Sequence, residues 1–87
     1  MTGPPKSAKS LLQEWSQRHL GQKPIYTVTA TSGPPHDQRF RVTVAIDGRT
    51  LGTGAGSSRQ RAEEQAALVA LATLRLEVDA NPAAATP

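Results

Sequence analysis

Three glycines recur at every second position in the middle of the chain, at Gly52, Gly54 and Gly56. Side chains of a strand alternate between its two faces, so this spacing leaves bare backbone along one face and permits close approach by a helix or ligand. The next segment, from Arg59 to about Leu76, predicts a helix with small residues at helical spacing: Ala62, Ala66, Val69, Ala70 and Leu74, flanked by Ala67 and Leu71. The pattern favours a helix that lies tightly on a sheet.

The residues before the glycines predict an antiparallel meander. From Arg39 to Ile46, apolar and polar residues alternate strictly, as in a half-buried strand. Asp47-Gly48 then suits a tight hairpin turn, and the glycine-bearing strand runs from Arg49 to about Ala55. Ile25 to Thr31 is rich in β-branched residues and predicts the first strand.

A helix is predicted ahead of these strands, from Ser7 to Leu20, with an apolar stripe of Ala8, Leu12, Trp15 and His19 beside Leu11. Gly21 is a suitable helix stop. The predicted fold class is therefore α+β, in the order α-β-β-β-α. Both helices should pack on one face of the three-stranded antiparallel sheet, because such a sheet has one core to offer. We expect residues 7–78 to form the domain, 1–6 a flexible linker and 79–87 a flexible tail.

Composition narrows the class of protein. With 87 residues and three aromatics, the chain has room for one domain with a thin core, which excludes a two-domain enzyme. It has no cysteine, so neither disulfides nor thiolate metal sites support the fold. No apolar run reaches the roughly 20 residues of a membrane span, and residues 1–10 lack a signal-peptide core. We expect a soluble protein of the cytoplasm with no membrane partner.

Ten Lys and Arg against seven Asp and Glu give a net charge of +3. That excess points to a polyanionic partner only if folding gathers it on one surface. The side chains with the potential to form such a surface lie in three places.

The first is a polar stripe on the opening helix, made of Ser10, Gln13, Glu14 and Gln17. A solvated face is the ordinary explanation, although neutral groups that donate and accept also suit 2′-hydroxyls and base edges in a shallow groove. The second is the loop Gly33-Pro34-Pro35-His36, in which two prolines hold the chain rigid and aim the imidazole. It is either an inert turn or a contact element.

The third is the segment Ser57-Ser58-Arg59-Gln60-Arg61 at the start of the last helix. Free N–H groups, the positive end of the helix dipole and two arginines together form an anion site, while an ordinary capped helix is the alternative. A metal site is not supported, because His19 and His36 are the two histidines and no acidic residues have ligand spacing. No nucleophile or carboxylate is placed beside His36 for catalysis.

Together with the element order, these motifs resemble the double-stranded RNA-binding domain from about Lys6 to Leu76. The matching residues are Lys9-Ser10, Leu12-Gln13-Glu14-Trp15, Pro24, Tyr26, Gly33-Pro34-Pro35-His36, Phe40, Gly54-Ala55-Gly56, Ser58-Arg59-Gln60-Arg61-Ala62-Glu63 and Ala66-Ala67. The Leu-Gln-Glu-Trp run and the Ala-Glu pair look most like the C-terminal domain of bacterial ribonuclease III.

The resemblance implies contact with two successive minor grooves and the phosphates between them. The opening helix would place Ser10, Gln13, Glu14 and Gln17 in one minor groove, and Pro34 and His36 would enter the next. Arg59, Gln60 and Arg61, with the N–H groups near Ser57 and Ser58, would face the phosphates. The family usually has two adjacent lysines there, and this chain has Arg59-Gln60, with Glu63 where many members outside ribonuclease III carry a third lysine. We expect weaker binding than is usual for the family, with strong salt sensitivity.

The resemblance also implies a division of labour. Ribonuclease III activity needs a separate domain with a carboxylate-rich Mg²⁺ site, so this chain alone is predicted not to be an enzyme and to hold no cofactor. We expect the substrate-binding module of a ribonuclease III whose catalytic domain would precede Met1, with Thr2–Pro5 as linker remnant. The predicted partner is double-stranded RNA; dimerisation would occur through the parent catalytic domain, and the isolated domain would be a monomer. The alternative is a domain of this fold that serves protein association or dimerisation.

Overall fold

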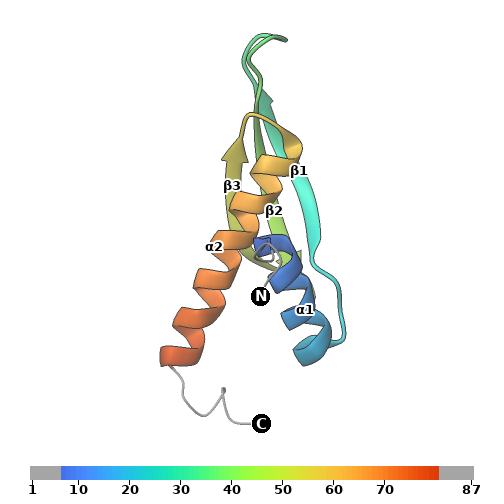
Figure 1. Ribbon diagram of the computed structural model, residues 1–87, viewed down its shortest axis with the longest axis vertical. Helices are drawn as coiled ribbons and strands as arrows, with labels where there is room; N and C mark the ends of the chain where they lie inside the picture. The colour runs from blue at the N-terminus through green and yellow to red at the C-terminus, as the bar shows by residue number, and fades with distance from the viewer. Residues whose placement is uncertain (1–6, 81–87) are drawn as a thin grey trace, which may run out of the picture.

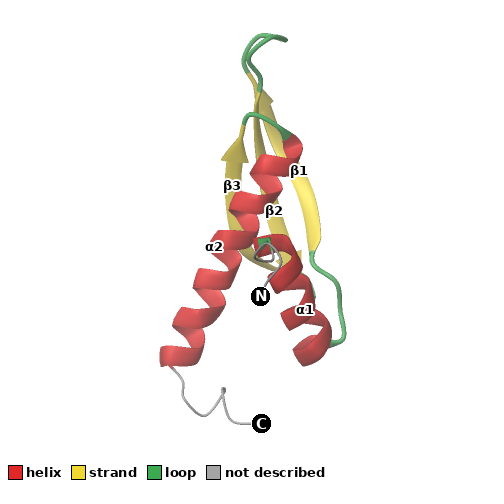
Figure 2. Ribbon diagram, viewed as in Figure 1, coloured by secondary structure: helices red, strands yellow, loops and turns green. Residues whose placement is uncertain are grey.

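The computed structural model describes residues 7–80. The elements follow the order α1 (Ala8–Leu20), β1 (Ile25–Ser32), β2 (Arg39–Ile46), β3 (Arg49–Gly56) and α2 (Arg59–Ala80). The strands form one antiparallel sheet of order β1-β2-β3, and both helices lie on the same face of it (Figure 1, Figure 2). The predicted α-β-β-β-α fold is confirmed. The predicted linker at residues 1–6 and most of the predicted tail, residues 81–87, lie outside the described residues. Residues 79 and 80, predicted to begin the tail, belong to α2 instead. No described helix is long and apolar enough to cross a membrane.

The alternation of β2 determines which face of the sheet carries the core. Val42, Val44 and Ile46 are buried under the helices, with exposed fractions of 0%, 0% and 1%. The residues between them face the other side, where Thr43 pairs with Thr53 of β3. The Asp47-Gly48 hairpin has the positive φ angles expected of such a turn, 54° and 77°.

The glycines of β3 bring the backbones of β3 and α2 into direct contact. A Cβ atom at Gly54 would lie 2.6 Å from the carbonyl oxygen of Ala62, and one at Gly52 would lie 2.6 Å from that of Ala66. Both of these close contacts are with backbone atoms of α2, which cannot move aside as the end of a flexible side chain could. The tight packing predicted from the glycine spacing is confirmed, and it fixes where α2 begins and which way it points.

Two details of the helices differ from the predictions. The buried side of α1 contains Ser16, which is fully buried and donates a hydrogen bond from Oγ to the carbonyl oxygen of Gln22, whereas His19 is exposed. The apolar pattern of the sequence does not mark Ser16 as buried, because the acceptor of its hydroxyl, Gln22, lies beyond the end of the helix. The second difference is that α2 continues to Ala80, past the predicted end at Leu76, because the sequence has neither Gly nor Pro before Pro82 to stop it.

Candidate nucleic-acid interface

The exposed side of α1 carries the predicted polar stripe. The helix is closed at both ends by local signals: the Ser7 hydroxyl accepts a bond from the Ser10 N–H, and Gly21, at φ 65°, donates to the Gln17 carbonyl at 3.1 Å. Between these two ends the helix is regular, so polar residues three and four positions apart lie on one face. The four predicted residues are all exposed and line one shallow hollow: Ser10, Gln13, Glu14 and Gln17. The structure therefore brings this group together as predicted.

The β1–β2 loop projects beyond the end of the sheet (Figure 1). Gly33 has a φ of 91°, and the Asp37 N–H donates to the Pro34 carbonyl at 2.9 Å, which closes a turn over Pro35 and His36. Both Pro34 and His36 are exposed. The turn hydrogen bond adds to the restriction from the two prolines, so the imidazole sits on a short and constrained projection.

The first turn of α2 is capped but has open donors. Ser58 accepts a bond from the Arg61 N–H at 3.2 Å, and Ser57 accepts one from Arg61 Nη1 at 3.3 Å. Within residues 7–80, the backbone N–H groups of Arg59 and Gln60 have no partner. Exposed N–H groups at the positive end of a helix dipole, next to two arginines, form a site suited to a phosphate.

Glu63 holds two cations beside that site. Its Oε2 accepts a bond from Arg59 Nε at 3.0 Å, and its Oε1 accepts one from Lys9 Nζ at 2.5 Å. The hydrogen bond from Lys9 lowers the pKa of Glu63 below the ordinary value of 4.5; burial opposes the shift, and the bond from Arg59 adds to it. Because the carboxylate takes Nε, the two outer nitrogens of the Arg59 guanidinium stay available to a ligand. The Arg59 side chain is 61% exposed.

The three surfaces follow one another along the long axis of the molecule. Figure 1 shows the β1–β2 loop at one end, the start of α2 next and α1 furthest from the loop. That order matches the one expected for a minor groove, the phosphates between the grooves and a second minor groove. The structure thus places the three elements that carry the predicted residues in this order along the molecule.

Three groups at the helix interface were missed by sequence reasoning. Glu64 accepts bonds from the backbone N–H groups of Ala8 and Lys9, so α2 supplies a cap for α1. Lys9 Nζ also lies 5.2 Å from the centroid of the Tyr26 ring, whose buried hydroxyl has no partner among residues 7–80. Burial, then the charges of Glu63 and Glu64, raise the pKa of Tyr26 to about 12. The Arg59–Glu63 pair, four residues apart, is the one contact that helix spacing alone signals.

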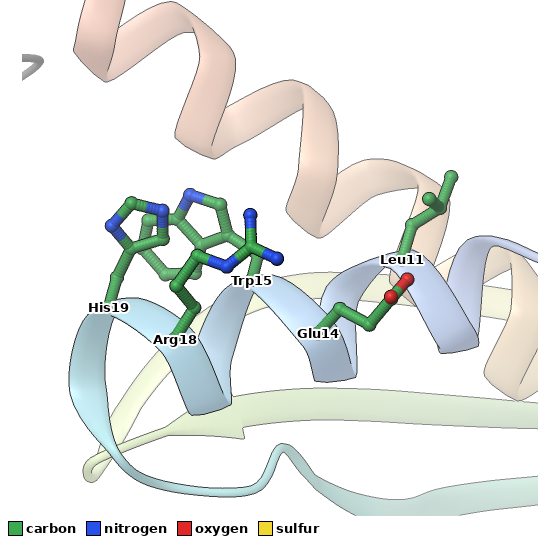
Figure 3. Close-up of a pocket in the computed structure, with 5 residues that line it drawn as sticks. All are labelled: Leu11, Glu14, Trp15, Arg18 and His19. Carbon is green, nitrogen blue, oxygen red and sulfur yellow. The ribbon is translucent and has the colours of Figure 1, made fainter.

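A second hollow on α1 adjoins the polar stripe and shares Glu14 with it. Figure 3 shows the rings of Trp15 and His19 side by side, with Arg18 beside them, and the two ring centroids are 4.9 Å apart at 31°. Trp15 packs partly against the core, and the exposed His19 covers its ring. His19 was predicted to lie on the apolar side of α1. In the structure it is not part of the core, and its exposed ring covers that of Trp15.

The fold and the three exposed surfaces define a small α+β binding domain that displays polar and basic groups along one axis. The chain belongs to the family of the double-stranded RNA binding motif, which it matches over residues 8–74. Among solved structures, it is similar to the second such domain of DRB4, with a TM-score of 0.59 and 35% identity, covering 80% of this chain and 97% of that one. Dicer from Pichia stipitis matches with a TM-score of 0.60 and 27% identity over 82% of this chain and 33% of that one.

Curated relatives are bacterial ribonucleases, which confirms the resemblance to ribonuclease III. Ribonuclease 3 of Geobacter metallireducens is 44% identical over 69 residues, or 79% of this chain. Ribonuclease 3 of Rhizobium johnstonii is 48% identical over 65 residues, or 75% of this chain. The chain spans 27–28% of the length of these two relatives.

Proposed function

We propose that this chain binds double-stranded RNA through its A-form shape, 2′-hydroxyls and phosphates, with little dependence on sequence. It would act as the substrate-binding module of a ribonuclease III. The observation that carries this proposal is the order of the three exposed surfaces along the molecule, since A-form RNA presents minor groove, phosphates and minor groove in that order along one side. Family membership supports the same conclusion.

The α1 surface supplies groups that suit the wide, shallow minor groove of RNA. Gln13 and Gln17 each donate and accept, and Ser10 does both through one hydroxyl. A 2′-hydroxyl also donates and accepts, so these side chains can pair with it whatever the base. DNA lacks that hydroxyl and has a narrower minor groove, which accounts for the expected preference.

The start of α2 supplies the electrostatic part of binding. The open N–H groups of Arg59 and Gln60 face a phosphate with the helix dipole behind them, and the Arg59 guanidinium adds a fixed charge. Ser57 holds the Arg61 side chain at the same end of the helix. This part of the affinity should be lost as the salt concentration rises, with a slope of log affinity against log salt of about one for each phosphate contact.

The loop supplies the second minor-groove contact. Pro34 and His36 are exposed on a turn that is constrained before RNA arrives, so little conformational entropy is lost when they enter a groove. The 27–28% share of the relatives' length supports the inference that cleavage, its Mg²⁺ ions and dimerisation belong to another domain. This chain would contribute RNA affinity in the cytoplasm without a cofactor of its own.

The direct test is titration of the chain at low salt with a 20-base-pair RNA duplex, the same duplex in DNA and a single strand of RNA. The proposal predicts binding of the RNA duplex well ahead of the other two. Equal affinity for all three would contradict it, and binding of none, together with self-association, would favour the protein-association alternative.

A pair of opposite substitutions tests the phosphate surface. Arg59→Ala should weaken binding to every duplex and lower the slope of log affinity against log salt by about one. Gln60→Lys should tighten binding and raise that slope by about one. Thr53→Lys is the matched control, because it adds the same charge to the sheet face that the helices leave uncovered. If Thr53→Lys tightened binding as much as Gln60→Lys, net charge alone would explain the gain.

A further inference from the structure

The N-terminus of α1 is closed by a carboxylate that comes from α2. Glu64 Oε2 accepts from the Ala8 N–H at 2.7 Å, and Oε1 accepts from the Lys9 N–H at 3.2 Å. The next N–H group, that of Ser10, bonds to the Ser7 hydroxyl, and the first regular helical bond follows from the Leu11 N–H to the Ser7 carbonyl oxygen. The three N–H groups of the first turn, which have no partner within the helix, are therefore all satisfied here. The first turn of α1 has no acidic residue of its own, so Glu64 also supplies the charge that favours this end of the dipole.

The two RNA-contact helices are thus tied together at the ends where their contact residues begin. Glu64 lies on α2 five residues after Arg59, and it bonds to the start of α1, where Lys9 lies four residues before Gln13. The neighbouring Glu63 adds a second link through Lys9 Nζ, whose charge also lies over the Tyr26 ring of β1. Because α2 is seated on the glycines of β3, this link fixes α1 relative to the rigid part of the fold.

We propose that Glu64 is a positioning residue for RNA binding: by holding the first turn of α1, it sets the separation between the α1 surface and the phosphate surface of α2. This inference rests on the proposed function. A duplex presents grooves and phosphates at fixed spacing, so a domain with that spacing preset loses less freedom on binding. Glu64 touches no RNA in this account and acts through the placement of Ser10, Gln13 and Gln17.

The sign of the effect separates this role from simple electrostatics. Glu64 lines the same hollow as Arg39, Ser57 and Arg61, near the expected phosphate surface. If its charge were all that mattered, removing it would tighten binding to a polyanion. Positioning predicts the reverse, because a less firmly held α1 has to be ordered when RNA binds.

Two substitutions separate the effect of the Glu64 charge from the effect of its side-chain length. Glu64→Gln removes the charge and leaves one accepting oxygen for two N–H groups, while Glu64→Asp keeps the charge and withdraws the carboxylate by one methylene. Both should weaken binding to a 20-base-pair RNA duplex about fivefold. Neither should change the salt slope, because no phosphate contact is lost, and the ratio of RNA to DNA affinity should fall with the α1 contacts. Affinities are measured where thermal unfolding shows every variant to be folded.

Asp47→Asn is the matched control, since it removes one negative charge at the β2–β3 turn and keeps a residue suited to its φ of 54°. It should bind RNA as tightly as the parent or slightly more tightly. If the parent prefers the RNA duplex and Glu64→Gln also binds like Asp47→Asn, the positioning role is wrong and the proposed function stands. If the parent shows no duplex preference, the proposed function fails first. Should Glu64→Gln not fold, Glu64→Asp alone decides, because charge by itself predicts no change for it.

Discussion

The two helices begin in opposite chemical states. At the start of α1, the donors are satisfied by Ser7 and by the carboxylate of Glu64 from the other helix. At the start of α2, Ser58 caps the Arg61 N–H, and the N–H groups of Arg59 and Gln60 have no partner within residues 7–80. The two helix N-termini thus carry the same positive end of a helix dipole, but a carboxylate binds the N–H groups of one, and two N–H groups of the other stay open.

The difference separates a structural helix end from a binding one. A helix start that already holds a carboxylate has neither the charge nor the free donors to attract a phosphate. Glu64 therefore stabilises α1 and also removes it as a competing anion site. Of the two helix starts within residues 7–80, the start of α2 is the one that keeps backbone donors open to a polyanion.

The largest effect should come from displacing α2, which would disrupt both helix ends at once. Gly54→Val places a branched side chain where even a Cβ would lie 2.6 Å from the Ala62 carbonyl oxygen. We expect a loss of about 3 kcal/mol or more in the free energy of unfolding, measured by urea denaturation. Ala55→Ser, on the exposed face of the same strand, should change it by less than about 0.5 kcal/mol. Equal losses for the two would contradict the backbone contact.

A sharper test places a carboxylate at the open helix end. Ser58→Asp keeps a good cap and adds a charge that favours the dipole, so the free energy of unfolding should rise by up to about 1 kcal/mol. RNA affinity should fall tenfold or more, because the new charge repels the phosphate. Ser7→Asp makes the same change at α1, where Glu64 is already present. It should not stabilise the protein and should affect binding less; similar results at both ends would break the comparison.

A smaller effect depends on pH through Glu63. Its pKa is lower in the folded protein than the ordinary 4.5, so its ionised form stabilises the fold above that value. The contribution should be lost as the pH falls below 4.5 and the folded carboxylate takes up a proton. Glu63→Gln should therefore reduce the free energy of unfolding at pH 6 to 7, by less than about 1 kcal/mol, and matter less at pH 3. A difference from the parent that grew at low pH would contradict this sign.

The smallest effect at neutral pH concerns Tyr26, the single tyrosine of the chain. Its buried hydroxyl has no partner in the described part of the chain, so Tyr26→Phe should leave stability unchanged or raise it slightly. Absorbance of the phenolate in the parent should titrate near pH 12, against the ordinary value of 10.0. Because the unfolded chain ionises first, stability should fall from about pH 10 upward in the parent and less in the variant. A phenol that titrated near 10 would place the ring in solvent.

Local patterns in the sequence predict the elements and miss what joins them. The alternation of β2 gave its exact bounds, and the glycine spacing predicted the close packing of α2, because both are repeats within a few residues. Glu64 and Ala8 are 56 positions apart, and no periodicity connects them. The same holds for Lys9 and Glu63, which are 54 positions apart. In the sequence alone, Glu63 stands out only because many members of the family have a lysine at that position. The polar stripe, the loop and the α2 start were found because motifs mark them, whereas their order in space needed the fold.

The most direct test of the account is to follow the backbone amide signals of the chain by NMR while a 20-base-pair RNA duplex is added. Duplex binding by one extended surface predicts the largest shifts on the exposed stripe of α1, at His36 and at Arg59 to Arg61. The uncovered sheet face around Thr43 and Thr53 should change little. Shifts centred on that sheet face, or on α1 alone with the loop and the α2 start unaffected, would contradict the account.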